Sequence, residues 1–314
     1  MEDIFCDTNF RILSKLAEGG MGSIFLAEWQ GAVGFRKIVA IKMVKNEVIN
    51  RRDTKVMFVG EAKLVADLIH ENILQTYMLA QYEAGYYMVM ECVFGKNLEK
   101  IIQRHKELGR NVDPEIGAFI ISRVCRALHY AHNKADHTGK KLSIVHRDVT
   151  PSNIMINYGG VVKLTDFGIA KALSHRTPDE KTTIMGKYPY MSPEQVMFQG
   201  TDGRSDIFSL GLVFFELLTG KMVYKVDDID SLIDKMEKFR IPKVSKVNPN
   251  VPPALEEIVM KAVDLDPEKR FQTAGDMGKA LEHFMYDKGY GPTNEKLAKY
   301  LGDLFPEAAK NANW

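Results

Sequence analysis

The sequence has few cysteines and no long apolar run. Three cysteines, Cys6, Cys92 and Cys125, occur in 314 residues, and no two of them form a CxxC pair. This spacing gives no support for a disulfide framework or a cysteine-ligated zinc site, and it is typical of a reducing compartment. No stretch of about 18 consecutive apolar residues is present, so the sequence predicts no membrane span.

A strong net charge is also missing. Lys plus Arg number 42 and Asp plus Glu number 41, which leaves a formal net charge of +1. This balance gives no global attraction to nucleic acid or to an anionic membrane. The first residues, Met1-Glu2-Asp3, lack the basic and apolar regions of a signal peptide, so we expect a cytoplasmic protein. With 45% hydrophobic and 26% charged residues, the chain can bury a core.

The first 95 residues mix strand patterns with one helix. Strand-like runs at 10–16 and 23–29 flank a glycine turn at 19–22. Two further strands are expected over 37–44 and 86–90. Apolar residues at helical spacing predict a helix over 55–68.

After residue 95 the patterns are mainly helical. A long helix is predicted over 114–132, with Asp113 as its N-cap and Pro114 in its first turn. Further helices are expected over three ranges: 205–218, 253–263 and 273–284. The order predicts an α+β protein with a small sheet-rich lobe and a larger helical lobe. A cleft between two such lobes is the usual place for a ligand.

Two short motifs in the first lobe could bind phosphate. Residues 17–24 read AEGGMGSI between two strands, and glycines there allow backbone N–H groups to approach phosphate oxygens. An ordinary glycine hairpin is the alternative. Lys42 lies in an apolar strand, where a solvated edge lysine is the commoner explanation. Glu61, on the expected helix, could hold the Lys42 ammonium by an ion pair.

A second pair of motifs could provide a base and a metal site. Residues 146–153 read HRDVTPSN, and Asp166 begins a DFG sequence 18 residues after Asp148. The stretch between them predicts a hairpin that turns at 157–160 and brings Asn153 close to Asp166. An amide and a carboxylate suit a hard cation that also takes phosphate oxygens and water.

These motifs, in this order, resemble the eukaryotic-type (Hanks-type) serine/threonine protein kinase family, and their local sequences look most like those of bacterial members. Residues 192–194 read SPE where the family has APE, and Asp206 and Arg270 match further landmarks. The resemblance covers about residues 10–286. It implies a bilobal kinase fold with an N-lobe at about 10–90, a hinge at 91–95 and a C-lobe at 96–286. Residues 1–9 would be an extension and 287–314 a tail.

The resemblance implies an enzyme that uses ATP and Mg²⁺ to phosphorylate serine or threonine in proteins. Asp148 would be the base, and Asn153 and Asp166 would hold the metal. Lys42 would contact the α- and β-phosphates, positioned by Glu61. The residues implied to bind the nucleotide are Ala17, Gly19, Gly20, Gly22, Ile24, Ala40, Lys42, Glu61, Met90, Glu91, Val93 and Met155.

Three positions depart from the family pattern. Ala17 replaces the first glycine of the loop, where its methyl group disfavours positive φ. Thr150 stands where serine/threonine kinases usually have lysine, and Lys187 stands where they have threonine. We expect Lys187 to supply the missing charge to the γ-phosphate, which would make it a catalytic residue. The alternative is that Lys187 is a solvated loop residue.

Regulation is expected at the activation loop. Arg147 precedes the base, and in the family such an arginine often receives a phosphate from that loop. Thr182 and Thr183 are the predicted phosphosites. The alternative is that these threonines are merely solvated.

Other residues have expected structural roles. Glu194 and Arg270 should form a buried ion pair, Asp206 should bond to the catalytic-loop backbone, and His146 should pack beneath that loop. His132 and His137 lie in or beside the segment 133–143, which we expect to be a solvated loop without metal ligands.

The tail carries an apolar stripe of helical spacing: Leu297, Tyr300, Leu301, Leu304 and Phe305. It could pack on the C-lobe or serve a partner. Two alternatives to a protein kinase are a pseudokinase that acts as an ATP-binding scaffold, and a small-molecule kinase. The SPE segment and Arg270 argue against the second.

Overall fold

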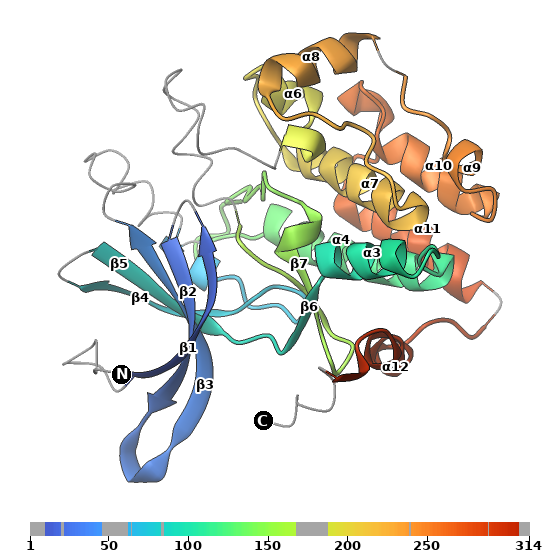
Figure 1. Cartoon of the computed structure of the whole chain (residues 1–314). Coiled ribbons are helices and arrows are strands. Elements are labelled where there is room, and N and C mark those ends of the chain that lie inside the picture. Colours follow the sequence, from blue (N-terminus) through green and yellow to red (C-terminus); the bar gives the residue numbers. More distant parts are fainter. Residues whose placement is uncertain are drawn as a thin grey trace. The chain divides into compact units, whose positions relative to one another are not determined.

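The computed structural model describes residues 10–19, 22–45, 62–63, 65–82, 85–167, 188–238, 240–287 and 289–307. These residues form two compact units (Figure 1). The first contains the described residues up to 70 together with Leu74–Val93. The second contains Glu71–Ile73, 94–167 and 188–307.

The first unit is built on a five-stranded antiparallel sheet with the strand order β1-β2-β3-β5-β4. The predicted strands at 10–16, 23–29, 37–44 and 86–90 are confirmed, whereas β4 was not predicted. The elements are β1 (Phe10–Gly19), β2 (Gly22–Gln30), the 3-10 turn η1 (Ala32–Gly34), β3 (Arg36–Lys45), β4 (Thr76–Tyr82) and β5 (Gly85–Glu91).

Both faces of this sheet are apolar. Val39 and Ile41 are fully buried in a cluster on one face, and Ala40 and Val44 belong to a cluster on the other. Because side chains alternate along a strand, Lys42 shares its face with Ala40 and Val44. The lysine therefore lies on a covered face of β3, and the solvated-edge alternative does not describe it.

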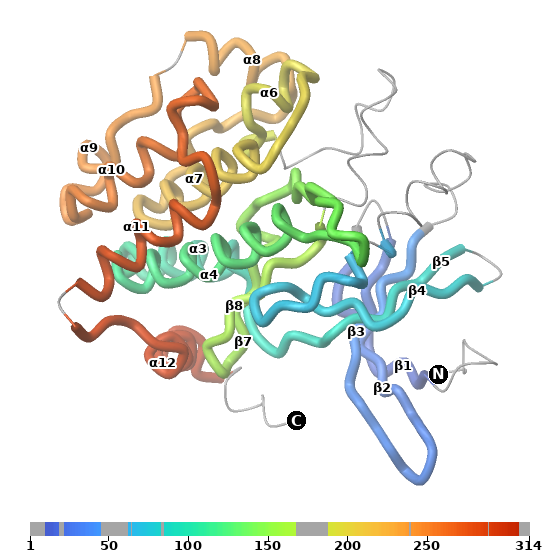
Figure 2. Tube along the Cα trace, turned by 180° about the vertical axis from the view of Figure 1, so that it is seen from behind, coloured from blue at the N-terminus to red at the C-terminus, as the bar shows by residue number. Residues whose placement is uncertain are grey.

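The second unit contains helices α3 to α12 and a small sheet of order β6-β7-β8 (Figures 1 and 2). Its strands are β6 (Gly95–Asn97), β7 (Ile154–Asn157) and β8 (Val162–Leu164). Its 3-10 turns are η2 (Pro151–Asn153), η3 (Tyr188–Tyr190) and η4 (Pro267–Lys269). Its α-helices are α3 (Leu98–Glu107), α4 (Pro114–His132), α6 (Pro193–Val196), α7 (Gly203–Thr219), α8 (Ile229–Lys238), α9 (Val244–Val247), α10 (Pro253–Ala262), α11 (Ala274–Tyr286) and α12 (Asn294–Leu304).

The core of the second unit is α7, which packs against α4 and α10. Every residue from 205 to 219 is buried. Gly211 permits close packing, because a Cβ atom there would lie 2.7 Å from a methyl carbon of Val263. The expected start of α4 is confirmed: the Asp113 side chain accepts the backbone N–H groups of Glu115 and Ile116. A buried, well-capped framework of this kind can fix the loops that it carries.

Candidate active site

Four predicted nucleotide-binding residues share one face of the first unit's sheet. Ile24 pairs directly with Lys42 across β2 and β3, and Ala40 pairs with Met90 across β3 and β5. Directly paired residues point to the same side of a sheet. Ala40 and Met90 are buried, and Ile24 and Lys42 are partly buried. The face therefore offers an apolar wall beside the Lys42 side chain.

The glycine loop meets a steric requirement at Gly22. Its φ is +154°, and a Cβ atom there would lie 1.8 Å from the carbonyl oxygen of Met43. Only glycine fits this position. Gly19 ends β1 opposite Gly22, whereas Gly20 lies outside the described residues. Ala17 pairs with Ile24 and is not among the described non-glycine residues with positive φ, so its methyl group adds no backbone strain.

The hinge segment has one backbone donor already in use. The N–H of Glu91 donates to the carbonyl oxygen of Gln75 at 2.8 Å. Of the two backbone groups of Glu91, the carbonyl oxygen is therefore the one that could bond to adenine. Val93 is partly buried. Burial and the neighbouring Glu91 raise the pKa of the Cys92 thiol to about 11, so this thiol is protonated at neutral pH.

In the second unit, hydrogen bonds tie the predicted base to a predicted metal ligand. The amide nitrogen of Asn153 donates to the backbone oxygen and to Oδ2 of Asp148, both at 2.9 Å. Thr165, the residue before Asp166, donates its N–H to the carbonyl oxygen of Asn153 at 2.8 Å. Asp148 and Asn153 are both 5% exposed. The hairpin thus brings Asn153 beside the segment that leads into Asp166.

The chemistry of this pair fits a hard divalent cation. The nitrogen of the Asn153 amide is engaged by Asp148, which leaves its Oδ1 as an oxygen donor, and Asp166 adds a carboxylate. Within the described residues, no group of three or more His, Cys, Asp or Glu side chains could hold a metal ion. A cation at Asn153 and Asp166 would therefore need oxygens from phosphate and water. Met155 follows on β7 and is partly buried.

Two of the five described non-glycine residues with positive φ lie in these loops. Arg147 and Asp166 are non-glycine residues with φ of 62° and 54°. Such conformations persist when the surroundings fix them. The carboxylate of Asp206 accepts the backbone N–H groups of His146 at 2.8 Å and Arg147 at 2.7 Å. Gln195 donates to the carbonyl oxygen of Arg147 at 2.9 Å. The expected bond between Asp206 and the catalytic loop is confirmed.

His146 has the expected structural role. It is 0% exposed, and its Nε2 lies 2.9 Å from the carbonyl oxygen of Thr165. Its Nδ1 accepts the backbone N–H of Asp148 at 3.2 Å. Burial lowers the pKa of His146, although the nearby carboxylates of Asp206 and Asp148 oppose the shift. The ring is therefore neutral and donates through Nε2.

One expectation about histidines is wrong. His132 is not part of a solvated loop: it is the last residue of α4, its side chain is 13% exposed, and its Nε2 lies 2.8 Å from Oδ2 of Asp206. Gly203 allows the approach, because a Cβ atom there would lie 2.6 Å from His132 Nδ1. The helix predicted over 114–132 already contained this histidine. Its contact with Asp206 joins segments 74 residues apart, and no local pattern reveals that.

The expected ion pair of Glu194 and Arg270 is present and buried. Their side chains are 10% and 0% exposed, and two hydrogen bonds of 2.8 and 3.0 Å join the carboxylate to the guanidinium. Ser205 also donates to Glu194, at 2.6 Å. Burial alone would raise the pKa of Glu194, but the hydrogen bonds from Arg270 and Ser205 outweigh it and lower the pKa.

Thr150 is described by the structure, but several other predicted residues are not. Thr150 is 3% exposed, and its hydroxyl lies 2.9 Å from that of Ser152. The residue expected to compensate for it, Lys187, lies outside the described residues. The same holds for Glu61, Thr182 and Thr183.

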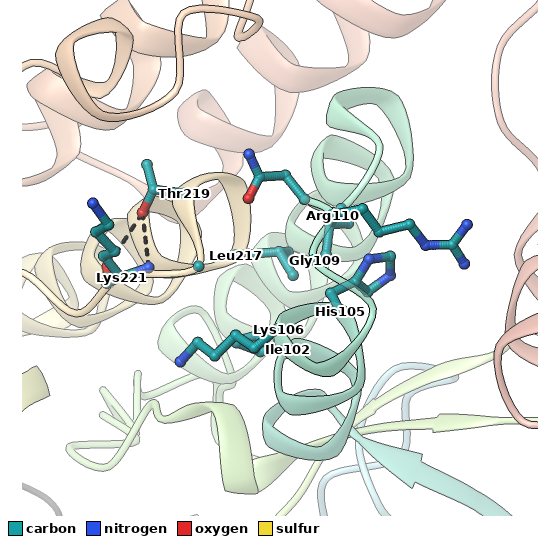
Figure 3. Close-up of a pocket in the computed structure, with 11 residues that line it drawn as sticks. Ile102, His105, Lys106, Gly109, Arg110, Leu217, Thr219 and Lys221 are labelled. Carbon is teal, nitrogen blue, oxygen red and sulfur yellow. Dashed lines mark hydrogen bonds between the residues drawn. The ribbon is translucent and has the colours of Figure 1, made fainter.

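A separate cavity of about 240 Å³ lies between α3 and the end of α7, and none of the predicted site residues lines it (Figure 3). Three cationic side chains surround it, those of Lys106, Arg110 and Lys221. Lys106 is paired with the buried Glu216 at 3.3 Å. Both helices end here, and positive charge stabilises a helix C-terminus. The charges around this cavity therefore have a structural explanation without a ligand.

The protein kinase domain family matches residues 10–284 of the sequence. The chain belongs to this family. Tyrosine-protein kinase MasK of Myxococcus xanthus (strain DK1622) is 35% identical over 94% of this chain and 46% of that protein. Serine/threonine-protein kinase PrkC of Bacillus subtilis (strain 168) is 35% identical over 85% of this chain and 39% of that protein. The kinase chain thus spans less than half the length of these curated relatives.

The kinase fold is shared with solved structures. The kinase domain of Mycobacterium tuberculosis PknI superimposes with a TM-score of 0.66 at 21% identity, over 88% of this chain and 95% of that one. The bilobal α+β class predicted from the sequence is therefore confirmed. In the part of the chain that the structure describes, none of the helices has the length and apolar character needed to cross a membrane.

Proposed function

We propose that this chain transfers the γ-phosphate of ATP to serine or threonine hydroxyl groups of protein substrates. Family membership supports an ATP- and divalent-cation-dependent protein kinase, and the name of the PrkC relative supports the acceptor. The observation that carries the proposal is the pair of bonds from Asn153 to Asp148. They orient a buried carboxylate beside a residue whose remaining amide oxygen can bind a cation.

Each role follows from the chemistry of the side chain. Asp148 would accept the proton of the substrate hydroxyl and orient its oxygen for in-line attack. Asn153 and Asp166 would hold Mg²⁺, which when bound neutralises charge on the triphosphate. Lys42, positioned by Glu61, would contact the α- and β-phosphates. Catalysis of this kind depends on positioning and electrostatics more than on covalent chemistry.

The remaining proposed residues would bind the nucleotide. The backbone of the glycine loop would cover the phosphates, and the hinge would hydrogen-bond to adenine. Apolar side chains would contact the base. The glycine-loop residues are Ala17, Gly19, Gly20 and Gly22, the hinge residues are Glu91 and Val93, and the apolar residues are Ile24, Ala40, Met90 and Met155.

The test compares Asp148→Asn with wild type in phosphate transfer from labelled ATP and Mg²⁺ to the chain itself and to a generic protein. A positioned base contributes about 10²- to 10⁴-fold, so we expect a loss of this size. Nucleotide binding should persist. Asp230→Asn, which changes an exposed carboxylate on α8, is the matched control. Nucleotide binding by wild type without any transfer would instead support a pseudokinase.

A tyrosine acceptor is the second candidate. MasK is named a tyrosine-protein kinase, and Thr150 stands where the serine/threonine family usually has lysine. Analysis of the labelled amino acid decides between the two. Label on tyrosine alone would overturn the proposed acceptor.

Two further proposals concern the activation segment. Lys187 would supply the γ-phosphate contact that Thr150 lacks, and near-normal turnover of both Lys187→Ala and Lys187→Thr would contradict this. Thr182 or Thr183 would be autophosphorylated. Intact mass and peptide mapping after incubation with ATP test the second proposal, which fails if neither threonine gains phosphate.

The setting of the domain is also a proposal. We place the kinase domain at 10–286, with an extension at 1–9 and a tail at 287–314, and we expect it to act in the cytoplasm. The lack of disulfide spacing among the three cysteines supports that location.

A further inference from the structure

Helix α12 lies beyond the region that the kinase family matches, which ends at residue 284. Its apolar stripe is covered within the second unit: Leu297 and Leu301 are 0% exposed, and Leu304 is 2% exposed. The alternative that this stripe serves a separate partner is therefore unsupported, because the leucines are already buried.

The segment that leads into α12 is fixed in place. The hydroxyl of Tyr286, at the end of α11, donates to the carbonyl oxygen of Pro292 at 2.8 Å. The Tyr286 ring lies so close to Gly291 that a Cβ atom there would be 2.4 Å from it. Thr293 caps α12 by accepting the N–H of Lys296. Helix α12 thus starts from a defined position.

Side chains of α12 contact two helices of the second unit. The hydroxyl of Tyr300 lies 2.5 Å from Nε2 of His105 on α3, and the two rings stack. Lys296 forms an ion pair of 3.0 Å with Glu115 in the first turn of α4. Burial raises the pKa of the Tyr300 phenol, so Tyr300 is the donor to the neutral His105 ring. These contacts fix both the place and the rotation of α12.

Helix α12 also packs its backbone directly against the turn between β7 and β8. Gly160, in that turn, has a φ of +78°, and a Cβ atom there would lie 1.8 Å from the carbonyl oxygen of Asn294. It would also lie 2.9 Å from the backbone nitrogen of Ala298. Both views of the chain show α12 beside this turn (Figures 1 and 2). Just past the helix end, Phe305 lies under the Lys96 ammonium of β6, 5.5 Å from ring centre to nitrogen.

We propose that α12 is a positioning element for the metal-binding pair of this kinase. The hairpin β7–β8 begins at Asn153 and ends just before Asp166, and α12 packs on its closed end. The open end is fixed by the bond from Thr165 to Asn153. With both ends held, the two oxygen ligands keep a fixed spacing before nucleotide arrives, and such preorganisation strengthens binding. The inference rests on the proposed function of Asn153 and Asp166.

The first experiment measures amide hydrogen exchange without nucleotide in Gly160→Ala and Gly139→Ala. Both glycines have similar positive φ, +78° and +84°, but nothing lies within 4 Å of a Cβ atom at Gly139. The two variants share the backbone strain, and only Gly160→Ala collides with α12. We expect exchange in β7, β8 and α12 to rise ~10-fold or more in Gly160→Ala alone.

A second pair of variants acts without touching the hairpin. Leu301→Ala removes a buried side chain of α12, and Leu281→Ala removes one of equal burial from α11. Leu301→Ala should reproduce the selective rise in hairpin exchange. Leu281→Ala should not, because α11 does not carry the contact with Gly160.

The second measurement is binding of a non-hydrolysable ATP analogue with and without Mg²⁺. Loosening of the hairpin should weaken binding in Mg²⁺ by ~10-fold more than it weakens metal-free binding in Gly160→Ala and Leu301→Ala. If exchange and Mg²⁺ response match the controls, or if exchange rises without a change in Mg²⁺ response, the positioning role is wrong. If wild type itself shows no Mg²⁺ response, the proposed metal-binding function of Asn153 and Asp166 is wrong. The positioning role of α12 is then wrong as well, because it rests on that function.

Discussion

Asp206 fixes Arg147 in a left-handed backbone conformation through a hydrogen bond of 2.7 Å from the Arg147 N–H to Oδ1. The other carboxylate oxygen accepts the N–H of His146 and lies 2.8 Å from the His132 ring. One buried carboxylate of α7 therefore sets the backbone that leads directly into Asp148. The geometry of the proposed catalytic base therefore depends on a residue outside the proposed catalytic set.

Replacing Asp206 should damage both stability and turnover. In Asp206→Ala one buried and one partly buried backbone donor lose their acceptor, and an unsatisfied buried group costs about 1–3 kcal/mol. We expect the free energy of unfolding to fall by about 3 kcal/mol. Urea unfolding and turnover measure the two effects. A variant with reduced stability but wild-type turnover at low temperature would show that Asp148 keeps its place without this carboxylate.

His132→Ala should separate positioning from stability. It removes one bond to Asp206 at a site 13% exposed, so we expect a loss of about 1 kcal/mol. Turnover should fall several-fold more than that of His129→Ala, which changes an exposed histidine one turn earlier on α4. Steady-state kinetics of both variants provide the comparison. Equal turnover would mean that the two backbone bonds suffice to hold Asp206.

The ion pair of Glu194 and Arg270 should show strong coupling. Removing one partner strands a buried charge, and such losses are about 3–5 kcal/mol. We therefore expect Arg270→Met and Glu194→Gln each to destabilise the chain by that order. The double variant should be less destabilised than the sum, because no unpaired charge remains. A double-mutant cycle from denaturant unfolding measures the coupling, and strict additivity would contradict a direct pair.

Stability should fall as the pH drops below about 6.5, the unfolded pKa of histidine. Burial lowers the pKa of both His146 and His105 in the folded chain. As the pH falls, the two histidines are protonated in the unfolded state before they are protonated in the folded state. The stability present above pH 6.5 is therefore lost between pH 6.5 and the lower pKa values of the folded chain. Unfolding curves from pH 7.5 to 5 measure the slope. His105→Gln should reduce this slope, because it removes one of the two buried histidines.

Local sequence signals predicted those parts of the chain whose structure is set locally. The long helix over 114–132, its Asp113 cap and the hairpin after Asn153 follow from apolar spacing and turn residues. The contact of His132 with Asp206 and that of α12 with Gly160 join distant segments, and they depend on packing that periodicity does not report. Strand β4 was not predicted, because its alternation is weak and most of its residues are only partly buried.

The packing of α12 against the turn at Gly160 limits how the length of that turn can vary among related sequences. Turns on the surface usually tolerate insertions, and the open turn at Gly139, with empty space around it, should differ in length among relatives. The turn at Gly160 has backbone packed against it and cannot lengthen without displacing α12. In an alignment, chains that carry this tail helix should therefore keep both the length and the glycine of that turn, and chains without it should lose the constraint.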